Sequence, residues 1–180
     1  MKLNLLYLLC CMTALFSTSG CATYVAGRYQ VTADNAVAMR SWKGIKLNVG
    51  NFVDATNNAV MSCNYKGDIT TMDGESYAQF IRNALLTELK FGDIYSETAP
   101  VTLSGRLDKV DNATALSTYW SFEVTITSSK GKSITILENY NYNGSVVGTP
   151  SSTCGAAASA FVPAVQNLLE KIIQKIPSLI

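Results

Sequence analysis

The stretch that decides the fold is WSFEVTITSSKGKSITILENYNY, residues 120–142. At positions 120–127 every second residue is apolar, and serine, glutamate and threonine occupy the positions between them. Such alternation predicts a strand that buries one face only. A Lys-Gly pair at 130–131 marks a tight turn, so residues 133–142 are predicted to return as the second strand of a hairpin. The residues expected on one face of this second strand are Ile134, Ile136, Glu138, Tyr140 and Tyr142.

Two segments repeat apolar residues at the three-four spacing of a helix face. The first predicts a helix over 74–90, with Asp73 as its N-cap and Gly92 as its C-terminal cap. Glu88 is the one polar member of its apolar stripe.

The second helix lies within residues 154–176. Its start stays open, because Pro163 either kinks the helix or sits in the first turn of a helix that begins near Ser159.

Alternating apolar residues predict two more strands, at 45–53 and 101–108. A sheet with one apolar face must be covered, and the two amphipathic helices are available to cover it. The expected fold class is therefore α+β: a two-layer sandwich of a mainly antiparallel four-stranded sheet with two helices on one face. The order is strand, helix, three strands, helix, and the opposite sheet face would be rich in serine and threonine.

The N-terminus has the parts of a bacterial lipoprotein signal. A lysine precedes an apolar run at 3–16, and four small residues at 17–20 lead to Cys21. We therefore expect a signal peptide over residues 1–20 and lipidation of Cys21. The alternatives are lipid on one of two earlier cysteines, cleavage without lipid, no cleavage, or a membrane span, for which the apolar run is short.

A lipidated Cys21 sets the expected location. Acyl chains contribute about 0.8 kcal/mol per buried methylene, so a multiply acylated cysteine holds a protein on a bilayer. Because Ala22 and not aspartate follows the cysteine, we expect a lipid anchor in the outer membrane, with the protein on its periplasmic side.

The 160 residues left after removal of the signal suit one domain. Residues 21–43 lack sustained periodicity and are expected to form a lipidated tether, in which a short helix capped by Asp34 or Asn35 is compatible with the pattern. Residues 44–180 are expected to form the single periplasmic α+β domain.

Cysteine usage predicts a cross-link. Of five cysteines, two leave with the signal and Cys21 is expected to carry lipid, so Cys63 and Cys154 remain. In an oxidising envelope two such thiols predict one disulfide, which would tie the last helix to the rim of the sheet. A metal-binding pair, which would lack histidine partners, and two buried free thiols are the alternatives.

Composition argues against several classes of function. The whole chain has 14 basic and 13 acidic residues and no histidine, and loss of the signal removes one lysine. A neutral mature chain argues against nucleic acid as a partner. The lack of histidine removes the commonest general base and the usual metal ligand. No catalytic residue, cofactor or metal site is predicted.

Several patterns have plainer interpretations than chemistry. The acidic groups around Asp54 and Asp73 lack the alternating ligand spacing of calcium loops, and turns and caps account for them. The hydroxyls at 151–153 have no histidine to activate them, and Lys130 or Lys132 would be too exposed at a hairpin tip to serve as a base.

Two further patterns are equally modest. Residues 144–148 lack the glycine spacing of a phosphate loop. Tyr140 and Tyr142 suit stacking on sugar rings or on a peptide, and core packing explains them at least as well.

The chain resembles a family of uncharacterised proteobacterial lipoproteins with a paired-cysteine α+β domain. The resemblance is carried by Cys63, Cys154, Trp120 and segments 32–40, 48–52, 80–85, 88–89, 128–133, 140–142 and 160–166. It implies no assigned activity. The element order is also similar to small outer-membrane lipoproteins of lipopolysaccharide transport and to the N-terminal domain of the Tol-system β-propeller protein, an analogy of fold.

These observations predict a non-enzymatic lipoprotein that binds or scaffolds another component of the cell envelope. The expected partners are the membrane, through the lipid, and an envelope protein. The surfaces expected to serve are a sheet edge and the serine- and threonine-rich face. The alternative is a binder of cell-wall glycan or lipid that uses the tyrosines.

Overall fold

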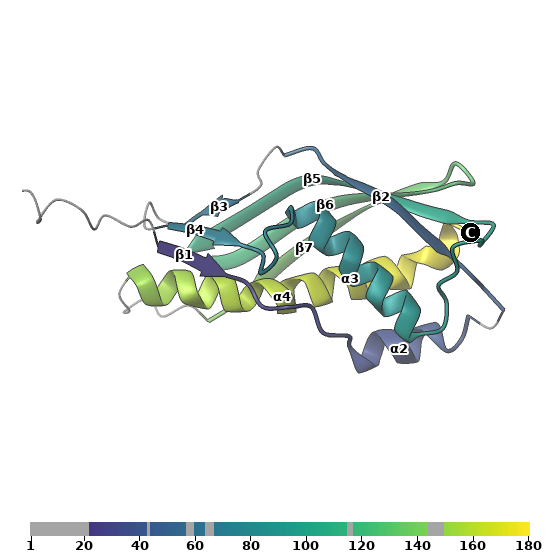
Figure 1. Ribbon diagram of the computed structural model, residues 1–180, viewed down its shortest axis with the longest axis horizontal. Coiled ribbons are helices and arrows are strands. Elements are labelled where there is room, and N and C mark those ends of the chain that lie inside the picture. Colours follow the sequence, from purple (N-terminus) through teal and green to yellow (C-terminus); the bar gives the residue numbers. More distant parts are fainter. Residues whose placement is uncertain (1–21, 43, 57–59, 64–66, 115–116, 144–149) are drawn as a thin grey trace, which may run out of the picture.

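A computed structural model shows a curved four-stranded sheet with helices on its concave face (Figure 1). The residues that it describes are 22–42, 44–56, 60–63, 67–114, 117–143 and 150–180. The sheet has the order β2-β5-β6-β7, with β2 parallel to β5 and the other pairs antiparallel. Its strands are β2 (Asn48–Asp54), β5 (Thr102–Thr114), β6 (Thr118–Ser128) and β7 (Ser133–Asn141). The expected α+β class and the four predicted strands are confirmed.

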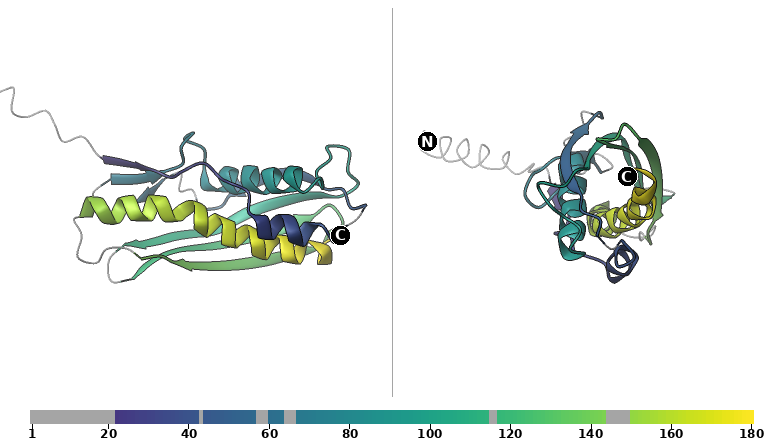
Figure 2. Two further views of the ribbon diagram at one scale, coloured as in Figure 1. Left: turned by 90° about the horizontal axis from the view of Figure 1, so that it is seen from below. Right: turned by 90° about the vertical axis from the view of Figure 1, so that its right-hand side faces the viewer.

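Two long helices, α3 (Tyr77–Phe91) and α4 (Pro150–Lys175), cover the concave face, and a 3-10 turn, η1 (Ile176–Ser178), follows α4. In the end-on view of Figure 2 the sheet curves around α4, and α3 lies beside it under β2. The core is the interface between these layers, where Phe161 of α4 packs at 5.0–6.1 Å between ring centroids against four aromatic rings. Those rings belong to Tyr77, Phe80, Trp120 and Phe122.

The predicted alternation holds in β6 and breaks in β2. Every second residue of β6 from Trp120 to Ile126 is fully buried. In β2 a bulge after Val49 shifts the register, so that Phe52 is buried and Val53 is 59% exposed. Phe52 lies against Gly105, where an added Cβ would stand 2.4 Å from its ring, so this strand position needs glycine.

The hairpin between β6 and β7 turns where the sequence predicts. Gly131 has a φ of +81°, a conformation that glycine adopts without steric cost. The convex face carries the expected hydroxyls, and two cross-strand pairs hydrogen-bond there, Thr125 with Thr135 at 3.0 Å and Thr127 with Ser133 at 3.2 Å.

Both helices begin elsewhere than predicted. Ser76, and not Asp73, caps α3: its hydroxyl accepts from the amide of Gln79, while Asp73 pairs with Arg28. Gly92 does cap the C-terminus of α3. Helix α4 begins at Pro150 and runs through Pro163, so the proline lies inside the helix and removes one backbone donor without ending it.

A second, small sheet was not expected. Its order is β1-β4-β3, with β1 (Ala22–Val25) parallel to β4 (Gly67–Thr70) and β3 (Met61–Ser62) antiparallel to β4. The following residues form α2 (Ala33–Met39), which Thr32 caps in place of Asp34 or Asn35.

The expected tether over residues 21–43 is therefore wrong for the part that the structure describes. Residues 22–42, the N-terminal arm, lie along the domain, and Ala26 and Met39 are buried. The arm has little apolar periodicity because backbone pairing to β4 holds its first part, and backbone hydrogen bonds place no demand on side-chain type.

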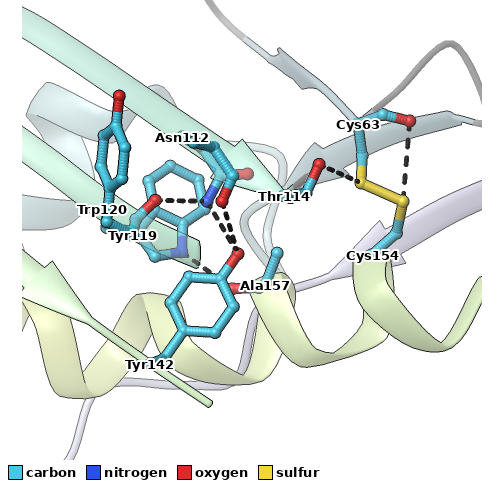
Figure 3. Close-up of a disulfide and its surroundings, with 9 residues drawn as sticks. Cys63, Asn112, Thr114, Tyr119, Trp120, Tyr142, Cys154 and Ala157 are labelled. Atoms are coloured by element: carbon cyan, nitrogen blue, oxygen red, sulfur yellow. Dashed lines mark hydrogen bonds between the residues drawn. A yellow bond between two sulfur atoms is a disulfide. The ribbon is translucent and has the colours of Figure 1, made fainter. Parts of the chain in front are cut away.

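Cys63 and Cys154 form the predicted disulfide, with their Cα atoms 5.8 Å apart (Figure 3). Cys63 directly follows β3 and lies beside Thr114 at the end of β5, while Cys154 stands in the second turn of α4. The bond ties α4 to the small sheet. One turn further on, the indole of Trp120 donates to the carbonyl of Ala157 at 2.8 Å. None of the helices in the described ranges is both long and apolar enough to cross a bilayer.

Candidate interaction site

The structure does not assemble the acidic residues into a cation site. Asp54 accepts hydrogen bonds from the amide and hydroxyl of Thr56, which is a turn role. Asp73 pairs with Arg28 at 3.2 Å, and Glu75 accepts from Asn83. Among the described residues no three histidine, cysteine, aspartate or glutamate side chains gather around a common point.

The hydroxyls near the start of α4 and the hairpin lysines lie at opposite ends of the molecule. Lys132 donates to the backbone oxygen of Ile180, just beyond the C-terminal end of α4. Residues 152 and 175 are separated by 23 residues of helix, roughly 35 Å. No lysine-activated hydroxyl can be built from these groups. Residues 144–148 and Cys21 lie outside the described residues.

The two tyrosines near the end of β7 serve the sheet. The hydroxyl of Tyr142 donates to the carbonyl of Ala113 at 3.2 Å and accepts from Asn112 at 3.3 Å (Figure 3). Burial raises the pKa of this hydroxyl. Tyr140 is half-buried against the core. Such bonding explains Tyr142 as a tie between β5 and the end of β7.

Glu88 has a role that sequence reasoning missed. It is fully buried in α3, and its Oε1 accepts from the hydroxyl of Tyr29 at 2.5 Å, the amide of Thr32 at 3.1 Å and the side chain of Asn35 at 2.9 Å. Burial, followed by the hydrogen bond to Glu88, raises the pKa of Tyr29. One carboxylate thus holds the N-terminal arm to α3, and a glutamate on an apolar helix stripe was its sequence signal.

The free edge of the sheet is the outer side of β7. Two backbone hydrogen bonds, from the amide of Ser128 to the carbonyl of Lys132 and from the amide of Tyr142 to the carbonyl of Thr118, set the pattern. In this register the N–H and C=O groups of the even-numbered residues of β7 point toward β6. The odd-numbered residues therefore direct their N–H and C=O groups away from the sheet. These residues are Ser133, Thr135, Leu137, Asn139 and Asn141.

A single side chain reaches this row of backbone groups within the described part of the chain. Lys171 of α4 donates to the carbonyl of Leu137 at 3.1 Å and pairs with Glu138 at 2.6 Å. Glu138 is 3% exposed, as expected for the inward position that the sequence assigned to it, and the lysine supplies the charge that compensates it. The Leu137 side chain is 65% exposed.

A groove of about 560 Å³ runs beside this edge, between β7 and the C-terminal part of α4. The strand supplies its apolar wall, and the helix supplies two lysines. The lining residues are Ile134, Thr135, Ile136, Leu137, Lys171, Gln174, Lys175 and Ser178. The exposed edge, the groove and Leu137 together form the β7 groove site.

Another hollow, of about 430 Å³, lies between the N-terminal arm and α3. Among its charged groups, Arg28 pairs with Asp73, and Glu75 accepts a hydrogen bond from the neutral side chain of Asn83. Burial is the main cause that raises the pKa of Glu75. Met72, Phe80 and Ala84 are part of its lining, but both of its carboxylates already have partners within the chain.

Comparison with known proteins supports the fold and no activity. No protein-family model and no curated protein matches the chain. The fold is similar to the crystal structure of a Xanthomonas campestris protein of the family DUF330, with a TM-score of 0.58 and 11% identity over 84% of this chain and 92% of that one. A solved structure of an uncharacterised protein matches with a TM-score of 0.41, 13% identity and coverage of 84% and 99%, too distant to carry an argument.

The chain therefore shares its fold with an uncharacterised bacterial protein family. At 11% identity the likeness concerns the fold alone.

Proposed function

We propose that this protein is a lipoprotein of the outer membrane that faces the periplasm and acts, without catalysis, as a binding or scaffolding component of the cell envelope. The proposed anchor is a lipidated Cys21 after removal of residues 1–20. The lysine, short apolar run and small residues before the cysteine support this, as does the disulfide, which suits an oxidising compartment.

The observation that carries the binding role is the β7 edge, which no other strand of the described chain covers. Five residues direct backbone donors and acceptors outward, and one carbonyl among them is met by a described side chain, Lys171. Soluble proteins commonly cover, charge or shorten such an edge, because it pairs with other chains. An edge of nine residues beside an apolar groove is suited to a partner that adds a strand.

The absence of an activated nucleophile or acid–base pair among the described residues supports a non-enzymatic role. The hydroxyl-rich segment at the start of α4 and the lysines lie far apart, and no histidine occurs in the chain. The glycan-binding alternative draws less support, because the Tyr142 hydroxyl is already bonded within the sheet.

Site-specific photocrosslinking in living cells tests the proposal. A crosslinking residue at Asn139, on the β7 edge, is expected to capture an envelope protein, and one at Val53, exposed on β2, is expected to capture none. Leu137→Pro removes one outward donor and should abolish capture from 139, while Leu137→Thr keeps the donor and should retain it. Equal capture from both edges, or none from either, would contradict the proposal, and retention by purified sacculi would favour glycan binding.

The anchor has its own test. Cys21→Ser should leave the protein uncleaved or soluble and remove it from the outer-membrane fraction. Persistence of this variant in that fraction at high salt would refute the lipid anchor.

A further inference from the structure

We infer that the occupant of the β7 groove site is an extended acidic segment of a partner protein, with two carboxylates at positions i and i+2 on its inward face. This inference rests on the proposed binding function and adds the chemistry of the partner.

The backbone sets the conformation of the occupant. The outward N–H and C=O groups recur at every second residue of β7, at the spacing that an added strand matches. A helix satisfies its own backbone groups and would leave those of β7 unpaired. An added strand would cover the exposed side chain of Leu137 on the convex face and the wall made by Ile134 and Ile136 on the concave face.

The charge of the groove sets the composition of the occupant. Lys171 and Lys175 are the charged residues that line it. Of the acidic side chains nearby, Glu138 is buried and already paired with Lys171, and Glu170, which accepts from Gln174, is not part of the lining. No described acidic side chain pairs with Lys175. The groove thus offers positive charge to any chain lying in it.

The spacing of the two lysines matches a strand. Lys171 and Lys175 are four residues apart on α4, a rise of about 6 Å along the helix. Alternate residues of an extended chain lie about 6.6 Å apart on one face. Two carboxylates at i and i+2 of an added strand would therefore face the two ammonium groups in succession.

Lys171 has to change partners when the strand arrives. The carbonyl of Leu137 would accept from an N–H of the added strand, and Lys171, which now donates to that carbonyl, would keep Glu138 and turn toward the incoming carboxylate. A lysine has three donors on a flexible stem, so this exchange leaves the buried Glu138 compensated.

The same charges disfavour a second copy of this chain as the occupant. Pairing β7 with β7 would bring Lys171 and Lys175 of each copy toward the sheet edge of the other. That edge offers them no carboxylate: its outward residues are serine, threonine, leucine and asparagine.

The test uses the full chain in detergent and three synthetic nine-residue peptides with blocked ends. Each alternates valine with a polar residue and differs only in the residues at two adjacent inward positions, which are aspartate, asparagine or lysine. The aspartate peptide is expected to bind tightest, and to slow hydrogen exchange at the amides of Ser133, Thr135, Leu137, Asn139 and Asn141.

Charge variants locate the effect. Lys175→Glu is expected to weaken binding of the aspartate peptide by about fivefold or more. The loss of one exposed ion pair accounts for up to about fivefold, and the new glutamate also repels the peptide. Lys90→Glu makes the same change in net charge at an exposed residue of α3, away from β7, and is expected to leave binding unchanged. Leu137→Pro should weaken all three peptides, because it removes a donor and no charge.

Several results would overturn the inference. These are equal binding of the three peptides, equal effects of Lys175→Glu and Lys90→Glu, or protection confined to other strands. Concentration-dependent protection of β7 without peptide would also overturn it, because it would make β7 an interface between copies. Capture of a protein from Asn139 in cells that Lys175→Glu leaves unchanged would sustain the proposed function and refute its acidic partner. Absence of capture from Asn139 in the otherwise wild-type protein would refute the proposed function itself.

Discussion

The two edges of the four-stranded sheet differ in how far their outward backbone groups are hydrogen-bonded. At β2, the backbone of Leu47 pairs with residues 94–96, and the guanidinium of Arg82 donates to the carbonyls of Gly50 at 2.7 Å and Val49 at 3.4 Å. The amide of Val49 donates to the side chain of Asn48. At β7, one lysine meets one carbonyl, and the rest of the outward row has no recorded partner in the described chain.

The difference separates a closed edge from one that can accept a strand. Arg82 presents a planar fork fixed between two carbonyls, whereas Lys171 presents a point charge on a flexible stem. Helix α3 stands over β2 and is itself held by the N-terminal arm through Glu88. The closed edge is thus built from several elements, whereas the contact made at the open edge comes from Lys171 of α4.

The largest expected effect concerns the position of α4. Cys63→Ala removes the bond that ties α4 to the small sheet, and releasing a constraint across 91 residues should lower the free energy of unfolding by about 4 kcal/mol. Denaturant titration of oxidised and reduced protein measures it. Reduced wild type should match the reduced variant, and equal stability of the oxidised and reduced wild type would contradict the expectation.

Breaking the arm contact should have the next largest effect. Glu88→Ala leaves the Tyr29, Thr32 and Asn35 donors without their acceptor and opens a cavity, so we expect a loss of about 3 kcal/mol in urea titration. Glu88→Gln is the matched control, because its amide oxygen can still accept, and it should cost about 1 kcal/mol or less. Similar losses in both variants would show that the carboxylate charge, not the acceptor, holds the arm.

Removing Arg82 should lower the free energy of unfolding by less than removing Glu88. It should also leave β2 with an uncovered edge, as at β7. Arg82→Ala leaves the Gly50 and Val49 carbonyls without the guanidinium, an expected loss of about 2 kcal/mol. Arg82→Lys, which keeps one donor, should lose less. Because an uncovered edge pairs with other chains, sedimentation should also show concentration-dependent association of the alanine variant alone. An alanine variant that stays monomeric with unchanged stability would mean that Arg82 does not close the edge.

The arm also predicts a pH dependence. The pKa of Tyr29 lies above its ordinary value of 10.0, chiefly because of burial and then because of Glu88, and burial also raises that of Tyr77. Because the pKa of Tyr29 is higher in the folded than in the unfolded state, the tyrosine loses its proton less readily when folded, and this difference stabilises the folded protein. The contribution is complete below about pH 10 and is lost as the pH rises further. Tyr29→Phe should cost about 1 kcal/mol at neutral pH and show a shallower loss above about pH 10 than wild type. Parallel alkaline curves would contradict the assignment.

The smallest effect on stability is expected at β7. Leu137→Pro removes an N–H that faces outward, at a position where proline is compatible with an edge strand, so the free energy of unfolding should change by about 0.5 kcal/mol. Thermal unfolding beside Leu137→Thr measures it. A loss as large as that of Arg82→Ala would show that the β7 edge is covered by the chain itself.

The sequence determined the local elements, because their signals are local. The alternation from Trp120 to Ile126, the glycine at 131 and the three-four spacing in α3 predicted the hairpin, the turn and a covering helix, and two remaining cysteines predicted the disulfide. These features follow from which side chains avoid water and from which backbone angles a residue tolerates.

Only the tertiary structure decided how these elements meet. The N-terminal arm is held by backbone pairing and by one carboxylate, neither of which leaves a periodic pattern in residues 22–42. The bulge after Val49 depends on the pairing of β2 with the distant strand β5. The alternation of side chains in β7 predicts which face of the sheet each residue lies on. It does not predict whether a second strand pairs with the outer edge of β7, because that depends on backbone groups. The sheet order makes β7 an edge, and the position of α4 places two lysines beside it.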